Sequence, residues 1–254
     1  MKITEHIDAL ETAGLALADA AAEAGPDAAV PTCPDWRIRD LLRHTTMVHR
    51  WATAFVAEGH TTYHPDGGEP ALDGDELLGH YREGHALLVA ALRAAPETLE
   101  CWTFLPAPSP LAFWARRQAH ETTVHRADAE SALATGPGPV DATLAADGID
   151  ELLRGFHARD RSRVHTPEPR TLRVRATDTG DMWTVRLSAT EPPRTERSTE
   201  TAETAAPADT ELSGAAHRLY LALWNRLPAD AVTLTGDAAL ARLWRDSSAI
   251  TWAG

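Results

Sequence analysis

The hydrophobic pattern of the sequence changes its period near residue 170. Before that point, apolar residues recur every three or four positions in long stretches without proline, which predicts amphipathic helices. After it, apolar and polar residues alternate, which predicts half-buried strands. A chain of 254 residues can form one large domain or two small ones. We therefore expect a helical domain over residues 1–165 and a smaller α+β domain over residues 170–254.

Four long helices are expected in the first domain, separated by loops rich in glycine and proline. Asp35 is a candidate N-cap for the second helix, and Pro110 suits the start of the fourth. Four helices of this length with connecting loops predict a four-helix bundle. The expected ranges are residues 3–23, 36–58, 75–94 and 111–134, followed by a shorter helix over residues 141–160.

A β-hairpin is expected to open the second domain. Leu172 and Val174 alternate with arginines, and alternation resumes at Trp183 after a turn at Gly180. Residues 191–209 are rich in Glu, Thr, Ala and Pro and are expected to form a loop or a poor strand. The remaining expected elements are a short strand ending near residue 212, a helix over residues 214–227, a strand over 232–235 and a last helix over 238–249.

The charge balance of the chain restricts its partners. With 37 acidic and 24 basic residues, the net charge is −13. This opposes general nucleic-acid binding and attraction to an anionic membrane. There is no apolar run of about 18 residues, no signal peptide is recognised, and two cysteines are too few for a disulfide framework. We expect a soluble, cytoplasmic protein without nucleic-acid or membrane partners, and the oligomeric state stays open.

Three residues carry the strongest chemical signal. Glu121 and His125 are four residues apart and share one face of the fourth helix. His44 lies on the apolar stripe of the second helix. A bundle brings such faces together around its axis, where metal sites are often built. Two imidazoles and one carboxylate form a ligand set that leaves one position of a catalytic divalent metal open for water or substrate.

Other interpretations of these residues exist. A histidine on an apolar stripe is often a hydrogen-bonded core residue, and a Glu-x-x-x-His pair is often a simple helix contact. The chain has 12 histidines, so chance pairs are expected. On the helical period, His120 points about 100° away from Glu121. The competing histidines are His49, His80, His85 and His120. Phosphate-binding, zincin and serine-hydrolase motifs are absent from the sequence.

Two segments around these residues resemble known signatures. The first is TCPDWRIRDLLRH at residues 32–44, followed by VHRW at 48–51, and the second is RRQAHETTVHRADAE at 116–130. Both resemble the mycothiol-dependent maleylpyruvate isomerase family, which belongs to the DinB-like metalloenzyme superfamily. The resemblance implies a DinB-like helical bundle followed by a C-terminal α+β domain, which looks related to sterol-carrier-like domains.

The resemblance also implies a cofactor and site residues. The family's zinc ligands match His44, Glu121 and His125, although N/O ligands accept other divalent metals. Its thiol cosubstrate is mycothiol, the low-molecular-weight thiol of actinobacteria. A family arginine implicated in activity matches Arg226 in the segment LWNR, where the family often has glycine instead of Asn225. The alternative for Arg226 is a solvated arginine at a helix end.

The expected chemistry uses a metal-activated thiol. A thiolate is a good fourth ligand for zinc, and neither Cys33 nor Cys101 is well placed as the nucleophile, so the thiol would come from a small molecule. An isomerase would add it to a conjugated cis double bond and eliminate it after rotation. An S-transferase would keep the adduct, for detoxification or within a biosynthetic pathway.

Arg226 would suit a substrate carboxylate. Four tryptophans could wall the cavity or belong to the core: Trp36, Trp51, Trp102 and Trp114. The alternatives to this chemistry are a metal-dependent hydrolase that uses zinc-bound water and a non-catalytic protein that binds a small ligand.

Overall fold

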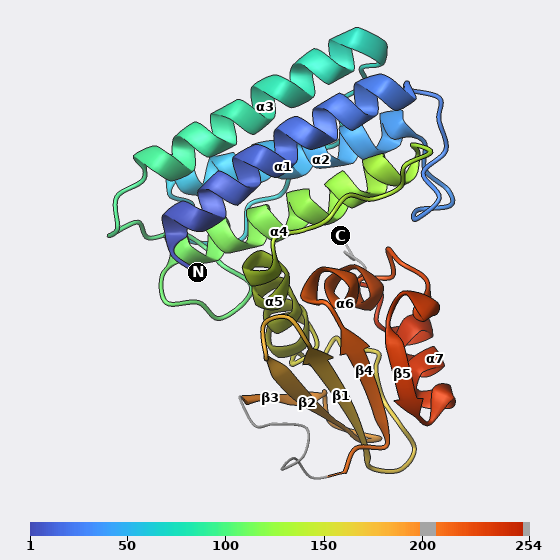
Figure 1. Ribbon diagram of the computed structural model, residues 1–254. Helices are drawn as coiled ribbons and strands as arrows, with labels where there is room; N and C mark the ends of the chain where they lie inside the picture. Colours follow the sequence, from blue (N-terminus) through green and yellow to red (C-terminus); the bar gives the residue numbers. More distant parts are fainter. Residues whose placement is uncertain (199–206, 251–254) are drawn as a thin grey trace. The chain divides into compact units, whose positions relative to one another are not determined.

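The computed structural model describes residues 1–198 and 207–250 and divides the chain into two compact units, Met1–Gly138 and Pro139–Gly254 (Figure 1). The division lies earlier than the expected boundary between residues 165 and 170. Helix α5 (Ala142–Asp150), expected to follow the bundle within the first domain, groups with the second unit because it packs against helix α6 (Ala216–Leu223).

The first unit consists of four long helices, as the period of the sequence predicts. They are α1 (Ile3–Ala24), α2 (Ile38–Glu58), α3 (Gly74–Ala94) and α4 (Pro110–Ser131). Helix α1 packs against α3 and α4, and α2 packs against the same two helices. The apolar core gathers leucines and alanines from these faces, among them Leu17, Leu41, Leu77 and Ala129.

Two predicted helix starts had different outcomes. Pro110 opens α4 after Ser109, whose hydroxyl accepts a hydrogen bond from the backbone N–H of Ala112 at 3.1 Å. The prediction that Asp35 caps a helix starting at Trp36 is wrong. Residues 28–37 form a loop in which the N–H of Val30 donates to the carbonyl of Trp36 at 3.0 Å. Helix α2 therefore starts at Ile38.

The second unit contains a five-stranded mixed sheet. The strands are β1 (Arg170–Ala176), β2 (Met182–Leu187), β3 (Arg194–Ser198), β4 (Thr210–Gly214) and β5 (Thr233–Gly236), and the sheet order is β3-β2-β1-β4-β5. Strands β1 and β2 form the predicted hairpin, with Leu172 opposite Val185. Strand β4 runs parallel to β1, and the other pairs are antiparallel.

The helices of the second unit pack against this sheet. Helix α5 continues into a π-helical turn at Glu151–Phe156, which contacts β3, and α6 contacts β1 and β4. Helix α7 (Ala238–Ser247) contacts β4, and a single 3₁₀ turn, Ala229–Ala231, precedes β5. Strand β3 lies in the segment expected to be a loop or a poor strand. Part of that segment, residues 199–206, lies outside the described residues.

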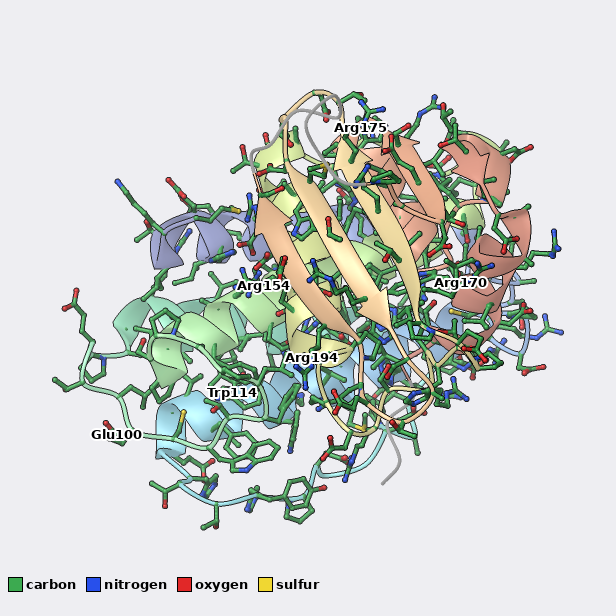
Figure 2. The ribbon with its side chains drawn as sticks, turned by 90° about the horizontal axis from the view of Figure 1, so that it is seen from below. Glu100, Trp114, Arg154, Arg170, Arg175 and Arg194 are labelled. Carbon is green, nitrogen blue, oxygen red and sulfur yellow. The ribbon has the colours of Figure 1, made fainter. Side chains whose placement is uncertain are left out.

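The alternation in β1 separates an apolar face from a charged one. Leu172 and Val174 are fully buried. The two arginines that alternate with them form ion pairs with Glu211 of β4, Arg175 at 2.8 Å and Arg173 at 3.7 Å. Figure 2, which labels Arg175, looks onto the strands of this sheet. Because these arginines are paired with a carboxylate, the charged face of β1 can be partly buried.

Helix α6 ends earlier than the predicted residue 227. The N–H of Asn225 donates to the carbonyl of Ala222 at 3.0 Å, and the N–H of Arg226 donates to the carbonyl of Leu221 at 2.7 Å. These two bonds are those of a Schellman motif, whose central residue is left-handed. Asn225 has that conformation, with a φ of 61°. Asparagine tolerates it better than most residues, which explains how it can replace the glycine of the resemblance.

None of the helices in the described ranges has both the length and the hydropathy that crossing a membrane requires.

Candidate metal centre

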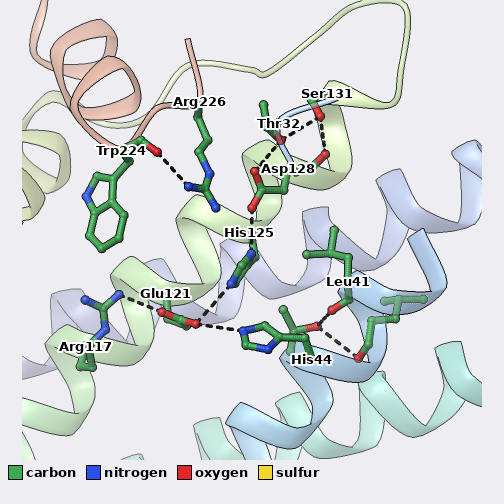
Figure 3. A network of polar contacts seen from close by, with 12 residues as sticks. Thr32, Leu41, His44, Arg117, Glu121, His125, Asp128, Ser131, Trp224 and Arg226 are labelled. Carbon is green, nitrogen blue, oxygen red and sulfur yellow. Dashed lines mark hydrogen bonds and ion pairs between the residues drawn. The ribbon is translucent and has the colours of Figure 1, made fainter. Parts of the chain in front are cut away.

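The structure brings His44 of α2 together with Glu121 and His125 of α4 (Figure 3). One carboxylate oxygen, Glu121 Oε1, lies 3.2 Å from His125 Nε2 and 3.6 Å from His44 Nε2. The three candidate ligand atoms all lie within 4.8 Å of one another. The predicted ligand set therefore converges on one point inside the first unit.

The separations suit a small divalent cation. Ligand atoms about 2.0–2.2 Å from a tetrahedral zinc are about 3.3 Å apart. The distances of 3.2 and 3.6 Å to the carboxylate oxygen lie close to that value. Neutral imidazole nitrogens and a carboxylate oxygen are also donors that zinc prefers. The three residues thus fit such a cation in both chemistry and spacing.

Glu121 is held in its ionised form. Burial alone would raise its pKa, but hydrogen bonds with His125 and His44 and the charge of Arg117 bring the pKa well below its usual range. Arg117, one turn earlier on α4 and almost fully buried, contacts the other carboxylate oxygen, Oε2, at 3.2 Å. The arginine leaves Oε1 directed toward the two histidines.

His125 lies between two carboxylates. Its Nδ1 is 2.8 Å from Asp128 Oδ2, and its Nε2 faces Glu121. Burial alone would lower its pKa, but the hydrogen bonds to Asp128 and Glu121 outweigh burial and raise the pKa to about 9. The two carboxylates thus favour the charged form of the imidazole.

Trp36 covers the two histidines of the cluster. Its ring centroid lies 5.0 Å from that of His44 and 6.0 Å from that of His125, and it stacks on the latter at an interplanar angle of 22°. Of the four tryptophans singled out in the sequence, this one contacts the cluster. The other three pack against one another. The ring centroid of Trp51 lies 5.4 Å from that of Trp114 and 6.0 Å from that of Trp102.

The competing histidines have other environments. His49 Nε2 is hydrogen-bonded to the hydroxyl of Thr122 at 2.9 Å, and burial lowers its pKa to about 3. His85 Nε2 donates to the carbonyl of Leu10 at 3.1 Å. Its ring occupies space that Gly14 leaves open, because a Cβ there would lie 2.2 Å from it. These two histidines have structural roles in the bundle.

The other two candidates also lie apart from the cluster residues. His120 is buried beside His6, with ring centroids 6.0 Å apart. His80 lies on α3 near Arg50, at 3.2 Å, and Glu83, at 3.7 Å. This placement of His120 agrees with the helical period, which directs its side chain away from that of Glu121.

Arg226 lies in the second unit, directly after the Schellman motif of α6. Its Nη1 donates to the backbone carbonyl of Trp224 at 2.8 Å, as Figure 3 shows. This contact uses part of a guanidinium group that has five N–H donors.

Sequence reasoning missed Arg117 and Asp128, which contact the candidate ligands. Both lie in the segment RRQAHETTVHRADAE that carried the resemblance. Their spacing was the available signal: Arg117 is four residues before Glu121, and Asp128 is three residues after His125, so each shares a helix face with its partner.

Two family models together match most of the chain. Residues 7–130 match the model of the mycothiol maleylpyruvate isomerase N-terminal domain, and residues 143–243 match that of the MDMPI C-terminal domain. No curated protein matches the sequence.

The fold is similar to two crystal structures of the mycothiol-dependent maleylpyruvate isomerase. One, a mutant with a histidine replaced by alanine, has a TM-score of 0.60 at 12% identity, over 92% of this chain and 93% of that chain. The other has a TM-score of 0.59 at 13% identity over the same shares. Since the two domain models match most of the sequence in order, the chain belongs to the mycothiol maleylpyruvate isomerase family of enzymes.

Proposed function

We propose that this protein is a mycothiol-dependent metalloenzyme that holds a divalent cation, zinc first, on His44, Glu121 and His125. The observation that carries the proposal is the convergence of three ligand atoms within 4.8 Å around a buried carboxylate. The family membership supports mycothiol as the thiol cosubstrate. Because mycothiol is the low-molecular-weight thiol of actinobacteria, we place the protein in the cytoplasm of such an organism.

A cation bound there would favour the deprotonated form of a thiol at neutral pH. The chain's own residues prepare the site for it. Arg117 and the two histidines keep Glu121 ionised. Trp36 stacks on His125 and also contacts the ring of His44, so that it shields both imidazoles on one side, and this strengthens the electrostatic interactions among these groups.

The reaction that this arrangement supports is attack of a thiolate on a small electrophile. In an isomerisation, the sulfur adds to a conjugated cis double bond, the carbon–carbon single bond rotates, and elimination restores the double bond in trans and releases the thiolate. In an S-transfer, the carbon–sulfur bond is kept. The family name favours the isomerisation of maleylpyruvate, with S-transfer as the alternative.

Arg226 is the second-unit residue that we propose for the substrate. Its planar guanidinium can hold a carboxylate with two parallel hydrogen bonds, which lysine cannot reproduce. We expect Arg226→Lys and Arg226→Ala to raise KM for a dicarboxylate substrate by roughly 10-fold or more. Both variants should keep the metal content of the wild type, and Arg226 would be only a structural residue if their kinetics were unchanged.

The test is an assay of maleylpyruvate with and without mycothiol, on zinc-loaded and on metal-free wild-type protein. We expect turnover only when both metal and thiol are present. Thiol-independent hydrolysis of an ester or amide panel would instead indicate the metal-dependent hydrolase. Small-ligand binding that is unaffected by metal removal, without turnover, would indicate the non-catalytic binding protein.

A further inference from the structure

Asp128 lies one helical turn after His125 and is fully buried. A buried carboxylate is costly unless hydrogen bonds compensate for its lost hydration. Oδ2 is 2.8 Å from His125 Nδ1, and Oδ1 accepts a hydrogen bond from the Thr32 hydroxyl at 2.6 Å. Both oxygens are thus engaged, one by a candidate ligand and one by the loop before α2.

The contact with Asp128 determines which nitrogen of His125 can bind a metal. An ionised carboxylate accepts hydrogen bonds and cannot donate them, so the proton of a neutral imidazole stays on Nδ1. The lone pair then lies on Nε2, the atom that faces Glu121 at 3.2 Å. A carboxylate behind a ligating histidine also makes it a stronger donor.

Thr32 connects this pair to the loop that carries Trp36. The Thr32 hydroxyl also lies 3.2 Å from the hydroxyl of Ser131, which donates to the backbone carbonyl of Asp128 at 2.7 Å. Four residues further along the same loop, Trp36 stacks on His125. Loop and ligand are therefore held through a continuous set of short polar contacts.

We infer that Asp128 is the positioning residue for His125, and that Thr32 holds Asp128 in place from the loop. The inference rests on the proposed function, since it assigns the two residues a role toward the cation bound by His44, Glu121 and His125. Asp128 acts through the histidine and does not itself contact the cation.

The first test is Asp128→Asn. The amide offers His125 either a neutral oxygen, which makes the imidazole a weaker donor, or an N–H, which forces the proton onto Nε2. We expect the Kd for Zn²⁺, measured by competition with a chromophoric chelator, to rise roughly 10- to 100-fold.

The matched control is Glu130→Gln on the same helix. Glu130 accepts from the N–H of Gly138 at 2.8 Å and pairs with Arg126 at 3.3 Å. It should bind Zn²⁺ like the wild type, so that a general effect of removing a carboxylate from α4 is excluded.

A second pair of variants covers the case in which Asp128→Asn does not fold. Thr32→Val removes the hydroxyl and keeps the shape, and we expect a rise in Kd of roughly 3- to 10-fold. Thr32→Ser restores the hydroxyl and should restore the affinity. The visible spectrum of bound Co²⁺ should change in Thr32→Val and return in Thr32→Ser, which a purely structural role of the loop would not produce.

The outcomes separate the inference from the proposed function. Wild-type protein that fails to bind Zn²⁺ and Co²⁺ would overturn the proposed metal centre, and the role of Asp128 with it. Tight binding by the wild type with equal affinities for Asp128→Asn, Thr32→Val and Glu130→Gln would overturn the inference alone. The expected order of affinity, with the wild type, Glu130→Gln and Thr32→Ser above Thr32→Val and Asp128→Asn, would support it.

Discussion

Two buried histidines, one in each unit, have opposite electrostatic environments. His125 in the first unit is 7% exposed and has its pKa raised to about 9, whereas His157 in the second is 1% exposed and has its pKa lowered to about 4. His157 lies against the ring of Trp244 at 4.8 Å, and its Nδ1 is 3.1 Å from the hydroxyl of Ser162. Burial and the nearby charge of Arg159 lower its pKa.

The difference shows that burial by itself removes charge from an imidazole, and that two carboxylates reverse this effect. His49 makes the same point within the first unit. It is fully buried, its hydrogen-bond partner is the hydroxyl of Thr122, and its pKa falls to about 3. The region around Glu121 therefore stabilises a positive charge, and the surroundings of His49 and His157 do not.

The largest effect that tests this comparison is expected from Glu121→Gln. The variant keeps the shape of the side chain and removes the charge that faces both candidate histidine ligands. Zinc-finger peptides, whose zinc has four ligands, bind it with about 10–16 kcal/mol, so that one ligand contributes about 3 kcal/mol, or roughly 100- to 1,000-fold in Kd.

Chelator competition with Zn²⁺ measures this loss. Glu83→Gln, which removes an exposed carboxylate paired with Arg50, is the control and should bind normally. An unchanged Kd in Glu121→Gln would break the link between the charge of this carboxylate and cation binding.

A smaller effect is expected when the pH falls across the titration of His157. The folded pKa of about 4 lies below the ordinary value of 6.5, so protonation favours the unfolded chain. The contribution of the neutral histidine to stability is complete above pH 6.5. About 2 kcal/mol is lost by pH 5 and about 3 kcal/mol by pH 4.

Urea unfolding at pH 7 and pH 5 checks this prediction, with His157→Gln as the comparison. Gln cannot gain a proton, so the difference in unfolding free energy between the two proteins should change by about 2 kcal/mol over this interval. If the difference stays constant, burial does not keep His157 neutral.

The smallest expected effect concerns how each unit positions a candidate site residue. His125 is held by side-chain hydrogen bonds, whereas the backbone before Arg226 is set by the left-handed Asn225. We expect Asn225→Ala to cost about 1 kcal/mol of unfolding free energy, because alanine is strained at positive φ. Asn225→Gly avoids this strain, so its unfolding free energy should lie about 1 kcal/mol above that of Asn225→Ala.

Thermal or urea unfolding of both variants measures the two values. Asn225 also donates from Nδ2 to the carbonyl of Arg245 at 2.9 Å, a bond that both variants lose. Equal costs for Ala and Gly would therefore assign the effect to this side-chain bond and contradict the backbone explanation.

The elements that the sequence predicts well are those with a long periodic pattern. Helix α1 and the hairpin of β1 and β2 depend on repeated apolar positions, so their type could be read directly. Strand β3 has no such pattern, because its sequence RTERS is mostly charged, and it is recognised only through its pairing with β2. The start of α2 depends on hydrogen bonds of the loop at residues 28–37, which no local pattern shows.

In the candidate site, too, some residues could be predicted from the sequence and others could not. His44, Glu121 and His125 could be chosen from helical spacing and the resemblance, and the structure brings them together. Trp36 could not be separated from the three other tryptophans, because its stacking on His125 depends on the path of a loop. Arg117 and Asp128 were within reach of helical spacing, but the sequence does not show that both are buried.

The most direct test is the metal content of protein purified without chelator and measured by mass spectrometry, for the wild type beside His44→Ala and His80→Ala. His80 is a half-buried histidine of α3 whose polar contacts are with Arg50 and Glu83. We predict about one divalent ion per chain in the wild type and in His80→Ala, and little in His44→Ala. A wild type without metal even after reconstitution, or equal metal in His44→Ala, would contradict the proposed metal centre.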